Sequence, residues 1–439
     1  MDILIITTYY PPDTAVAAVR PYMLAKYLTK RGHKVTVLRS GEFYNSASDF
    51  FEDIPVRVIS YLGPDSPAER YARGELKAVP VVESKGRFSS LPNVIRKPLA
   101  AVYGVIMRPV RFKRRQEYIA GKIEKQKTAL DELRNEHFDV VFSTFGEQEN
   151  IAAGQYAAKL FGCKLIQDFR DPLARKPFLT KREYCYLKRI QDEAIKRADG
   201  MTAVTEGFRR ELMESSGATT PNLTIYNGYE PFLQEQNTES VEQGVLSFCY
   251  TGILYGALSD FTPLMKALHR LDKEGRIDLS RIKINYAGRD FTQLQEIAEN
   301  LDMTKILHNH GYVSRTEAAR LQHISDIFLV LSWNRHDSQG VMPAKFYEGI
   351  RAKRTILSLV SGDLPGSELD LINEKYHYGF CYEAGRDKSN LDGLCDFLAK
   401  CYEEKMTVGK VRYEENPDLE ARFRYDNLAQ QLENFIRTI

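Results

Sequence analysis

The chain has 439 residues, of which 43% are hydrophobic and 27% charged, a balance typical of a soluble globular protein with two or three hydrophobic cores. Its 61 lysines and arginines nearly match its 59 aspartates and glutamates, so the composition indicates neither a nucleic-acid-binding protein nor an acidic tail. The six cysteines form no C-x-x-C pair and no zinc-like spacing, and we expect free thiols in a reducing cytoplasm.

The first elements along the chain predict a βαβ unit. Residues Asp2 to Thr7 form an apolar strand that is too short, and too acidic at its start, for a signal peptide. A helix follows and ends at Gly32, and a second strand spans Lys34 to Leu38. The stretch 41–115 is rich in Pro, Ser and Tyr with weak periodicity, which favours an insertion of loops and short helices.

Within this insertion, Pro98 to Met107 is a short apolar stretch with cations on both sides. The flanking cations are Arg96, Lys97, Arg108, Arg111, Lys113, Arg114 and Arg115. The pattern is typical of a helix that lies in a membrane interface, although a surface helix packed on its own domain has it too. The stretch is shorter than the roughly 18 apolar residues of a membrane-spanning helix. We expect a cytoplasmic protein, with an anionic membrane surface as a candidate partner of residues 96–115.

From residue 116 onward, helices and strands alternate as in doubly wound parallel sheets. The expected elements of the first half are helix Gln116–Asn135, strand Phe138–Ser143, helix Asn150–Phe161, strand Cys163–Gln167, helix Lys181–Arg197 and strands Gly200–Val204 and Leu223–Tyr226. A polar linker at Glu230–Gly244 precedes a second series. Its strands are expected near Leu246–Thr251, Ile282–Ala287, Lys305–Asn309, Ile327–Leu331, Thr355–Val360 and His377–Cys381. The pattern predicts two α/β domains, residues 1–230 and 245–415, facing each other across a cleft, and a terminal segment 416–439 whose helix docks through an apolar face.

The segment from Gly340 to Glu348 reads as a glycine turn and a helix that begins at Pro343, between two predicted parallel strands. Free N–H groups of the turn and the helix dipole favour an anion, and Lys345 adds a positive charge. Glu348 projects from the same helix face and can accept hydrogen bonds from a vicinal diol such as ribose. The segment therefore predicts a nucleotide-sugar site; an amphipathic helix with a solvated Lys–Glu pair is the alternative.

Several other chemistries lack their motifs. No G-x-G-x-x-G follows a strand and no G-x-x-x-x-G-K-[ST] occurs, which argues against a dinucleotide-dependent oxidoreductase and a P-loop kinase. No H-E-x-x-H occurs, and no two aspartates are separated by one residue, so the carboxylate pair with which many sugar transferases hold a metal is missing. We expect a site without metal or cofactor.

Short motifs follow one another along nearly the whole chain: Ile3–Pro12, Arg20–Tyr22, Arg31–Val35, Asp168–Pro172, Ala198–Thr205, Asn227–Gly228, His310–Val313 and Pro343–Glu348. In this order they resemble family 4 of the retaining GT-B glycosyltransferases, which builds bacterial surface polysaccharides such as capsule and lipopolysaccharide. The resemblance implies a UDP-hexose or UDP-N-acetylhexosamine donor on the C-terminal domain. It also implies a lipid-linked or growing glycan acceptor on the N-terminal domain, to which a C-terminal helix crosses back.

The resemblance also assigns roles to single residues. Glu348 is expected to hold the ribose hydroxyls, and Lys345 to take the diphosphate charge. The expected donor contacts are Gly252, Gly311, Tyr312, Val313, Arg335, Gly340, Val341 and Met342. Among these, the loop from Gly311 to Val313 resembles the segment that reads the base. Glycine at 340 would let the backbone N–H groups of 340–342 approach the sugar and phosphates.

Three positions depart from the family pattern. The first glutamate of the E-x7-E element falls at Gly340, eight residues before Glu348. No Arg–Lys pair follows the first C-terminal strand, and Ala15 to Ala18 replace the glycine pair after Pro11-Pro12. Arg335 or Arg289 is a candidate for the missing charge, and a solvated surface arginine is the alternative for each.

Two acidic residues follow the predicted strand Phe138–Ser143, where an acceptor would lie. Glu147 and Glu149 are candidates for orienting the acceptor hydroxyl, and helix N-terminal charges favoured by the dipole are the alternative. The leaving phosphate can share in deprotonating the acceptor, so no strong protein base is required. A UDP-sugar 2-epimerase of the same fold and a catalytically silent scaffold subunit remain alternative functions.

Overall fold

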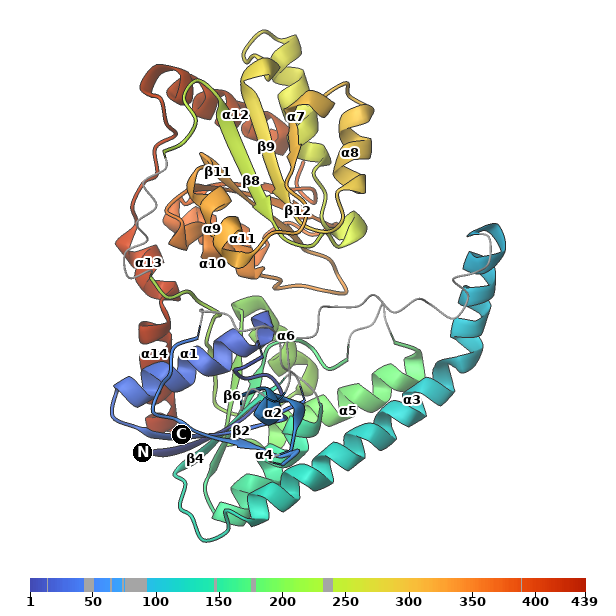
Figure 1. Ribbon diagram of the computed structural model, residues 1–439, viewed down its shortest axis with the longest axis vertical. Coiled ribbons are helices and arrows are strands. Elements are labelled where there is room, and N and C mark those ends of the chain that lie inside the picture. The colour runs from blue at the N-terminus through green and yellow to red at the C-terminus, as the bar shows by residue number, and fades with distance from the viewer. Residues whose placement is uncertain are drawn as a thin grey trace.

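A computed structural model describes residues 1–13, 15–42, 51–63, 65–72, 75, 93–145, 148–174, 179–231, 240–387 and 389–439. Figure 1 shows two α/β halves, one above the other, and the C-terminal segment passes from the upper half to the lower half along one side. In the described part of the chain, a seven-stranded parallel sheet forms the N-terminal half and a six-stranded parallel sheet the C-terminal half. The predicted class, two doubly wound α/β domains, is confirmed.

The N-terminal sheet has the strand order β3-β2-β1-β4-β5-β6-β7. Its strands are β1 (Asp2–Ile6), β2 (Lys34–Arg39), β3 (Arg57–Ser60), β4 (Val140–Phe145), β5 (Lys164–Phe169), β6 (Gly200–Ala203) and β7 (Asn222–Thr224). Its helices are α1 (Val16–Lys30), α2 (Pro67–Ala72), α3 (Asn93–Asp131), α4 (Gln148–Phe161), α5 (Lys181–Arg197) and α6 (Glu206–Ser216). In β1, the side chains from Ile3 to Ile6 are fully buried, as expected for a central parallel strand covered on both faces.

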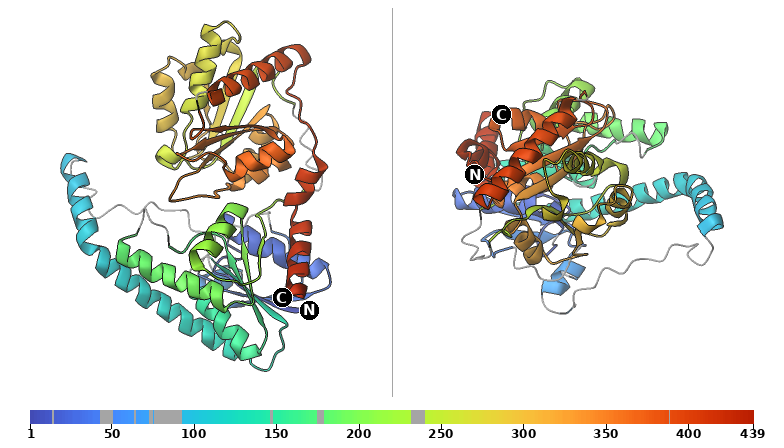
Figure 2. Two further views of the ribbon diagram at one scale, coloured as in Figure 1. Left: turned by 180° about the vertical axis from the view of Figure 1, so that it is seen from behind. Right: turned by 90° about the horizontal axis from the view of Figure 1, so that it is seen from above.

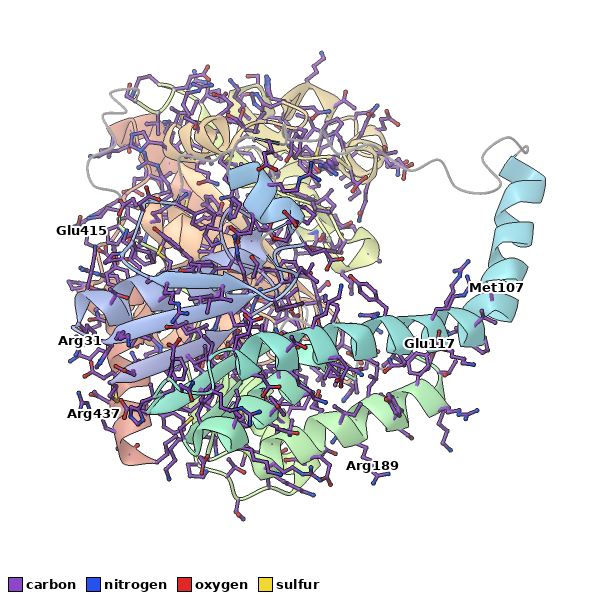
Figure 3. The ribbon with its side chains drawn as sticks, turned by 60° about the horizontal axis from the view of Figure 1, so that its bottom comes forward. Arg31, Met107, Glu117, Arg189, Glu415 and Arg437 are labelled. Atoms are coloured by element: carbon purple, nitrogen blue, oxygen red, sulfur yellow. The ribbon has the colours of Figure 1, made fainter. Side chains whose placement is uncertain are left out.

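The stretch 41–115 differs from the expectation of loops and short helices. Residues Arg57–Ser60 form edge strand β3, which pairs in parallel with β2. Residues from Asn93 onward belong to α3, a continuous helix of 39 residues. The sequence predicts this helix from Gln116, and the structure extends it toward the N-terminus. Arg108 bonds Glu183 of α5, and the Phe112 and Tyr186 rings lie 5.8 Å apart. The N-terminal part of α3 reaches past the end of α5 and bends away from the body (Figures 1 and 3).

The C-terminal sheet has the order β10-β9-β8-β11-β12-β13. Its strands are β8 (Leu246–Thr251), β9 (Ile282–Ala287), β10 (Leu307–Asn309), β11 (Ile327–Trp333), β12 (Thr355–Ser361) and β13 (Gly379–Glu383). Its helices are α7 (Thr262–Lys273), α8 (Thr292–Glu299), α9 (Arg315–His323), α10 (Ala344–Arg351), α11 (Glu368–Tyr376) and α12 (Ser389–Val408). Strand β11 pairs in parallel with β12, as predicted for the strands around the Gly340–Glu348 segment.

The C-terminal segment crosses back to the N-terminal half through α13 (Pro417–Phe423) and α14 (Tyr425–Thr438) (Figures 1 and 2). Leu428 and Leu432 of α14 are fully buried, and they belong to the same cluster of buried side chains as Ile3 of β1 and Phe346 of α10. One apolar core therefore joins both halves through the crossing segment.

A buried ion pair accounts for two of the sequence motifs. The Arg20 guanidinium donates two hydrogen bonds to Asp168, at 2.7 and 3.0 Å, and a third to the carbonyl oxygen of Tyr226. Both side chains are at most 2% exposed. The pair ties α1 to β5 and to the chain that leaves β7, and so sets the position from which the second half departs.

Candidate functional site

The carboxyl ends of β8, β9 and β10 bring three glycines close together. Gly252 N–H donates to the Ala287 carbonyl at 2.8 Å, and Gly288 N–H donates to the Gly311 carbonyl at 2.9 Å. A Cβ atom on Gly288 would lie 2.1 Å from the carbonyl oxygen of Gly252, so only glycine permits this approach. Two of the predicted donor positions, Gly252 and Gly311, thus lie at the same edge of the sheet.

Helix α10 brings Lys345 and Glu348 to this edge. The helix begins at Ala344, with Pro343 as its N-cap, one residue later than the sequence suggests. Lys345 Nζ lies 2.8 and 2.7 Å from the two carboxylate oxygens of Glu348, and each side chain is 26% exposed. Lys345 Cε lies 3.3 Å from where a Cβ on Gly252 would stand. Lys345, Glu348 and Gly252 are therefore together, as predicted.

Gln322, which the sequence analysis did not single out, positions the Glu348 carboxylate by a hydrogen bond. Its Nε2 donates to Glu348 Oε2 at 2.7 Å and to Thr251 Oγ1 at 2.8 Å. The side chain of Gln322 is buried at the end of α9. No local pattern marks it, because its role arises only when α9, β8 and α10 come together.

The predicted base-reading loop adjoins the glycine cluster. Gly311 has a φ of 65°, and the Tyr312 side chain is 76% exposed. The Arg289 guanidinium lies 4.7 Å from the centre of the Tyr312 ring, a cation–π contact. Val313 packs against the small core around Cys249. Arg289, one of the two arginines proposed to supply charge, therefore contacts the base-reading loop.

The loop between β11 and α10 reaches the N-terminal half. Thr205 Oγ1 donates to the carbonyl oxygen of Gly340 at 2.7 Å. Gly340 has a φ of 65°, and a Cβ there would lie 2.6 Å from the backbone nitrogen of Phe208. A glutamate at position 340 has no room in this arrangement, which gives a physical reason for the departure from the family pattern.

The other predicted donor contacts in this loop are Val341, Met342 and Arg335, and their surroundings differ. The Val341 carbonyl accepts a hydrogen bond from Ser332 Oγ at 3.0 Å, and the Met342 side chain is buried in the core. Within the described ranges, no acceptor takes the N–H groups of Gly340, Val341 and Met342. Arg335, predicted as a donor contact, forms an exposed ion pair with Asp337 at 3.1 Å.

A second contact between the halves lies beside Gly340. Glu368, the first residue of α11, accepts hydrogen bonds from the backbone N–H groups of Glu206 and Gly207 at 3.1 and 3.0 Å. The Tyr226 hydroxyl also donates to Glu368, at 2.5 Å. A carboxylate at the N-terminus of α6 is favoured by the helix dipole. We call Glu368, the first turn of α6 and Tyr226 the interdomain latch.

On the N-terminal side, the structure describes one of the two acidic candidates for the acceptor. Glu147 lies outside the described residues. Glu149, in the first turn of α4, is fully buried and lies 2.7 Å from Lys122 Nζ. In this conformation it is part of a buried ion pair between α3 and α4, and its contact with an acceptor stays a prediction.

Asp13 is another acidic group that the sequence analysis missed. It follows β1 at the end of the Tyr-Tyr-Pro-Pro motif, is 3% exposed and accepts a hydrogen bond from Ala15 N–H at 2.9 Å. Burial raises the pKa of Asp13 above its usual range, while the charges of Arg39 and Arg315 oppose the rise. Arg315 belongs to the C-terminal half, so Asp13 lies where the halves face each other.

Within the described part of the chain, no group of three or more His, Cys, Asp and Glu side chains is arranged to hold a metal ion. No helix in the described ranges is long and apolar enough to cross a membrane. Metal independence stays a prediction.

No protein-family model and no curated protein sequence matches the chain, but solved structures do. HepE from Anabaena, solved with UDP and glucose, is 13% identical with a TM-score of 0.56, over 100% of both chains. Sucrose-phosphate synthase from Thermosynechococcus elongatus is 12% identical with a TM-score of 0.61, over 100% of this chain and 98% of that one. The lipopolysaccharide outer core galactosyltransferase WaaB is 13% identical with a TM-score of 0.55, over 100% and 99%. At these identities the likeness establishes the architecture: the chain has the GT-B fold.

Proposed function

We propose that this protein is a glycosyltransferase that moves a sugar from UDP-hexose or UDP-N-acetylhexosamine to a lipid-linked or growing glycan, with retention and without a metal. The observation that carries the proposal is the grouping of Lys345 and Glu348 against the glycine edge of the second sheet. The full-length likeness to HepE, solved with UDP and with UDP-glucose, and to the galactosyltransferase WaaB supports it.

The chemistry required is stabilisation of a departing diphosphate. In the proposed complex, Lys345 leaves the Glu348 carboxylate for the diphosphate, and the N–H groups of residues 340–342 donate to it as well. Such preorganised donors are usually the largest electrostatic contribution to catalysis. Glu348, still held by Gln322, accepts hydrogen bonds from the ribose hydroxyls.

We further propose that α3 holds the protein at an anionic membrane, where a lipid-linked acceptor would be found. Its N-terminal part stands clear of the body, and Met107 lies farther out than Glu117 (Figure 3). Val110 and Tyr118 are 41% and 53% exposed on this helix. Arg111, Lys113, Arg114 and Arg115 are exposed beside them. Apolar groups among cations are what an interfacial helix requires.

Gly340 stands where the E-x7-E element has its first glutamate. This replacement favours a second candidate function, a subunit that binds a nucleotide sugar without turnover. The two functions share the donor site and differ in chemistry. A thermal-shift titration with UDP, GDP, ADP and their sugars, followed by an assay of donor hydrolysis and transfer, separates them.

The matched variants are Glu348→Ala in the proposed site and Glu415→Ala in an exposed pair with Lys353. At 100 times its Kd a ligand adds about 2.7 kcal/mol of apparent stability. We expect a UDP-selective shift and turnover in the wild type and in Glu415→Ala, both lost in Glu348→Ala. Binding without turnover supports the subunit, and no shift with any nucleotide contradicts both functions.

A further inference from the structure

A cavity of ≈ 400 Å³ lies where the C-terminal segment meets the edge of the N-terminal sheet. Helix α6, strand β7, α13 and α14 contribute to its wall. The side chains that matter for its chemistry are Glu206, Arg209, Asn222, Tyr226, Arg422 and Gln431. Its size falls in the range of small-molecule sites, about 300 to 1,000 Å³. None of these residues was assigned to the donor site.

The charges in this wall leave one cation unneutralised. The only carboxylate among these six side chains, that of Glu206, accepts hydrogen bonds from Arg209 at 2.5 and 3.1 Å and from Thr224 at 2.7 Å. Arg209 is therefore neutralised within the wall. Arg422 forms no ion pair with any described carboxylate, so the lining side chains together carry one net positive charge. The Glu368 carboxylate lies behind the Tyr226 hydroxyl, which separates it from Arg422.

Two aromatic rings orient the Arg422 guanidinium so that it can bind a planar or tetrahedral anion. Its guanidinium lies 5.0 Å from the centre of the Tyr226 ring and 5.9 Å from that of Phe423, and the side chain is half-buried. Stacking fixes the plane of the guanidinium, so less side-chain entropy is lost when an anion binds its N–H groups. Gln431 adds an amide group that can bond hydroxyls. The Asn222 amide is held within the wall, because its oxygen accepts from Arg209 and its nitrogen donates to the Thr220 carbonyl.

We propose that this cavity binds a small phosphate monoester such as a sugar phosphate, with the phosphate on Arg422 and a sugar hydroxyl at Gln431. A phosphate offers several strong acceptor oxygens to a guanidinium, and a second arginine stands in the same wall. An unphosphorylated sugar lacks the charge that Arg422 selects.

The cavity is connected to the interdomain latch. Arg422 Nη2 lies 3.5 Å from the Tyr226 hydroxyl, and that hydroxyl donates to Glu368 of the other half. Glu206 contributes its side chain to the cavity and its N–H to Glu368. A phosphate on Arg422 competes with the Tyr226 contact, so it acts on a bond that joins the halves.

The test is isothermal calorimetry with glucose 6-phosphate, inorganic phosphate and glucose at constant ionic strength. The background is Lys345→Ala, so that binding at the proposed donor site does not contribute. The variants are Arg422→Gln, which removes the cation, and Gln431→Glu, which places a negative charge at an exposed rim position and leaves the core intact. Arg134→Gln, in an exposed surface pair, is the matched control.

We expect saturable binding of glucose 6-phosphate in the background and in Arg134→Gln, weaker binding of inorganic phosphate, and none of glucose. Loss of the charge-assisted contact in Arg422→Gln, and repulsion of the phosphate by the added carboxylate in Gln431→Glu, should each weaken binding at least about tenfold. Absence of phosphate-ester binding, or equal affinity in all variants, overturns the proposal. The background lacks Lys345, so this outcome is independent of the proposed transferase activity.

Discussion

Lys345 Nζ is bonded to both carboxylate oxygens of Glu348, at 2.8 and 2.7 Å, so the two groups expected to hold opposite ends of a nucleotide diphosphate neutralise each other in this structure. A nucleotide sugar that binds as proposed must therefore separate Lys345 from Glu348. The pair also keeps both side chains in place on α10, which lowers the entropy cost of presenting them to a ligand.

Lys345→Gln should remove the main positive charge from the departing diphosphate. Loss of one such stabilising donor typically lowers kcat about 10²- to 10³-fold. Steady-state kinetics with the UDP-sugar selected by thermal shift would measure it. Lys353→Gln, on the exposed pair with Glu415, is the control and should leave kcat unchanged. Equal kcat in both variants would remove Lys345 from the proposed mechanism.

Gln322→Met should disturb ribose recognition without changing charge. Its amide holds Glu348 Oε2 at 2.7 Å, and a thioether of similar size makes no such bond. We expect the wild type to bind UDP more tightly than 2′,3′-dideoxy-UDP, and this preference to shrink several-fold in Gln322→Met, as measured by calorimetry. Gln295→Met, on the exposed side of α8, serves as control. An unchanged preference would mean that Gln322 does not position Glu348.

Gly340→Glu places a glutamate where the pattern of the resembled family has one, and it should open the molecule. The left-handed backbone adds strain of about 1–2 kcal/mol for a non-glycine residue, and the new Cβ meets the Phe208 nitrogen at 2.6 Å. Gly217→Glu is a control with a similar φ of 62° and no atom within 4 Å of the new Cβ. Urea unfolding should show the strain in both variants. Small-angle scattering should show a larger radius of gyration only for Gly340→Glu, and equal radii would contradict this account of the interdomain contact.

Glu433 on α14 should make stability depend on acid pH. Hydrogen bonds from Arg31 and Arg437 lower the pKa of Glu433 from 4.5 to about 2. Both arginines are labelled in Figure 3. A carboxylate with a depressed pKa in the folded state contributes stability that is complete above pH 4.5 and disappears as the pH falls toward 2.

Glu433→Gln lacks that contribution. The Tm difference between wild type and Glu433→Gln should therefore be largest near neutral pH and shrink between pH 4.5 and 2. Scanning calorimetry across this range would measure it, with Glu415→Gln as a surface control. A difference that stays constant with pH would show that Glu433 acts through packing and not through its charge.

Replacing Arg111, Lys113, Arg114 and Arg115 together by Gln should release the protein from anionic vesicles. Each cation near an anionic surface is worth about 1 kcal/mol, so the loss of affinity should exceed 100-fold. The matched control replaces four exposed cations elsewhere on the N-terminal half. These are Lys34, Arg134, Lys164 and Arg197. Equal vesicle sedimentation of both variants would contradict the membrane role of α3.

The candidate site was predictable where its signal is local. The glycine turn, the helix start and the spacing of Lys345 and Glu348 all lie within one short segment, and each follows from helix geometry. Gln322 and Glu368 were not predictable, because each acts on an element distant in the chain. A local sequence pattern does not indicate contacts between elements that are distant in the chain.

The alternation of strands and helices predicted the fold. The differences between this prediction and the structure have physical causes. Residues Arg57–Ser60 were assigned to an insertion, although they form β3, because an edge strand needs few apolar residues. A helix from Gln116 and a helical stretch at Pro98–Met107 were predicted, but not that both belong to one continuous helix, α3.

The position of α14 has a consequence for synthesis of the protein. This helix supplies Leu428 and Leu432 to the core that begins at β1, yet the ribosome makes it after the whole second sheet. The first half therefore lacks the part of its core that α14 supplies until the second half has been made. Because the buried cluster contains side chains of both halves and of α13 and α14, we expect both halves to complete their packing only after α14 has been made.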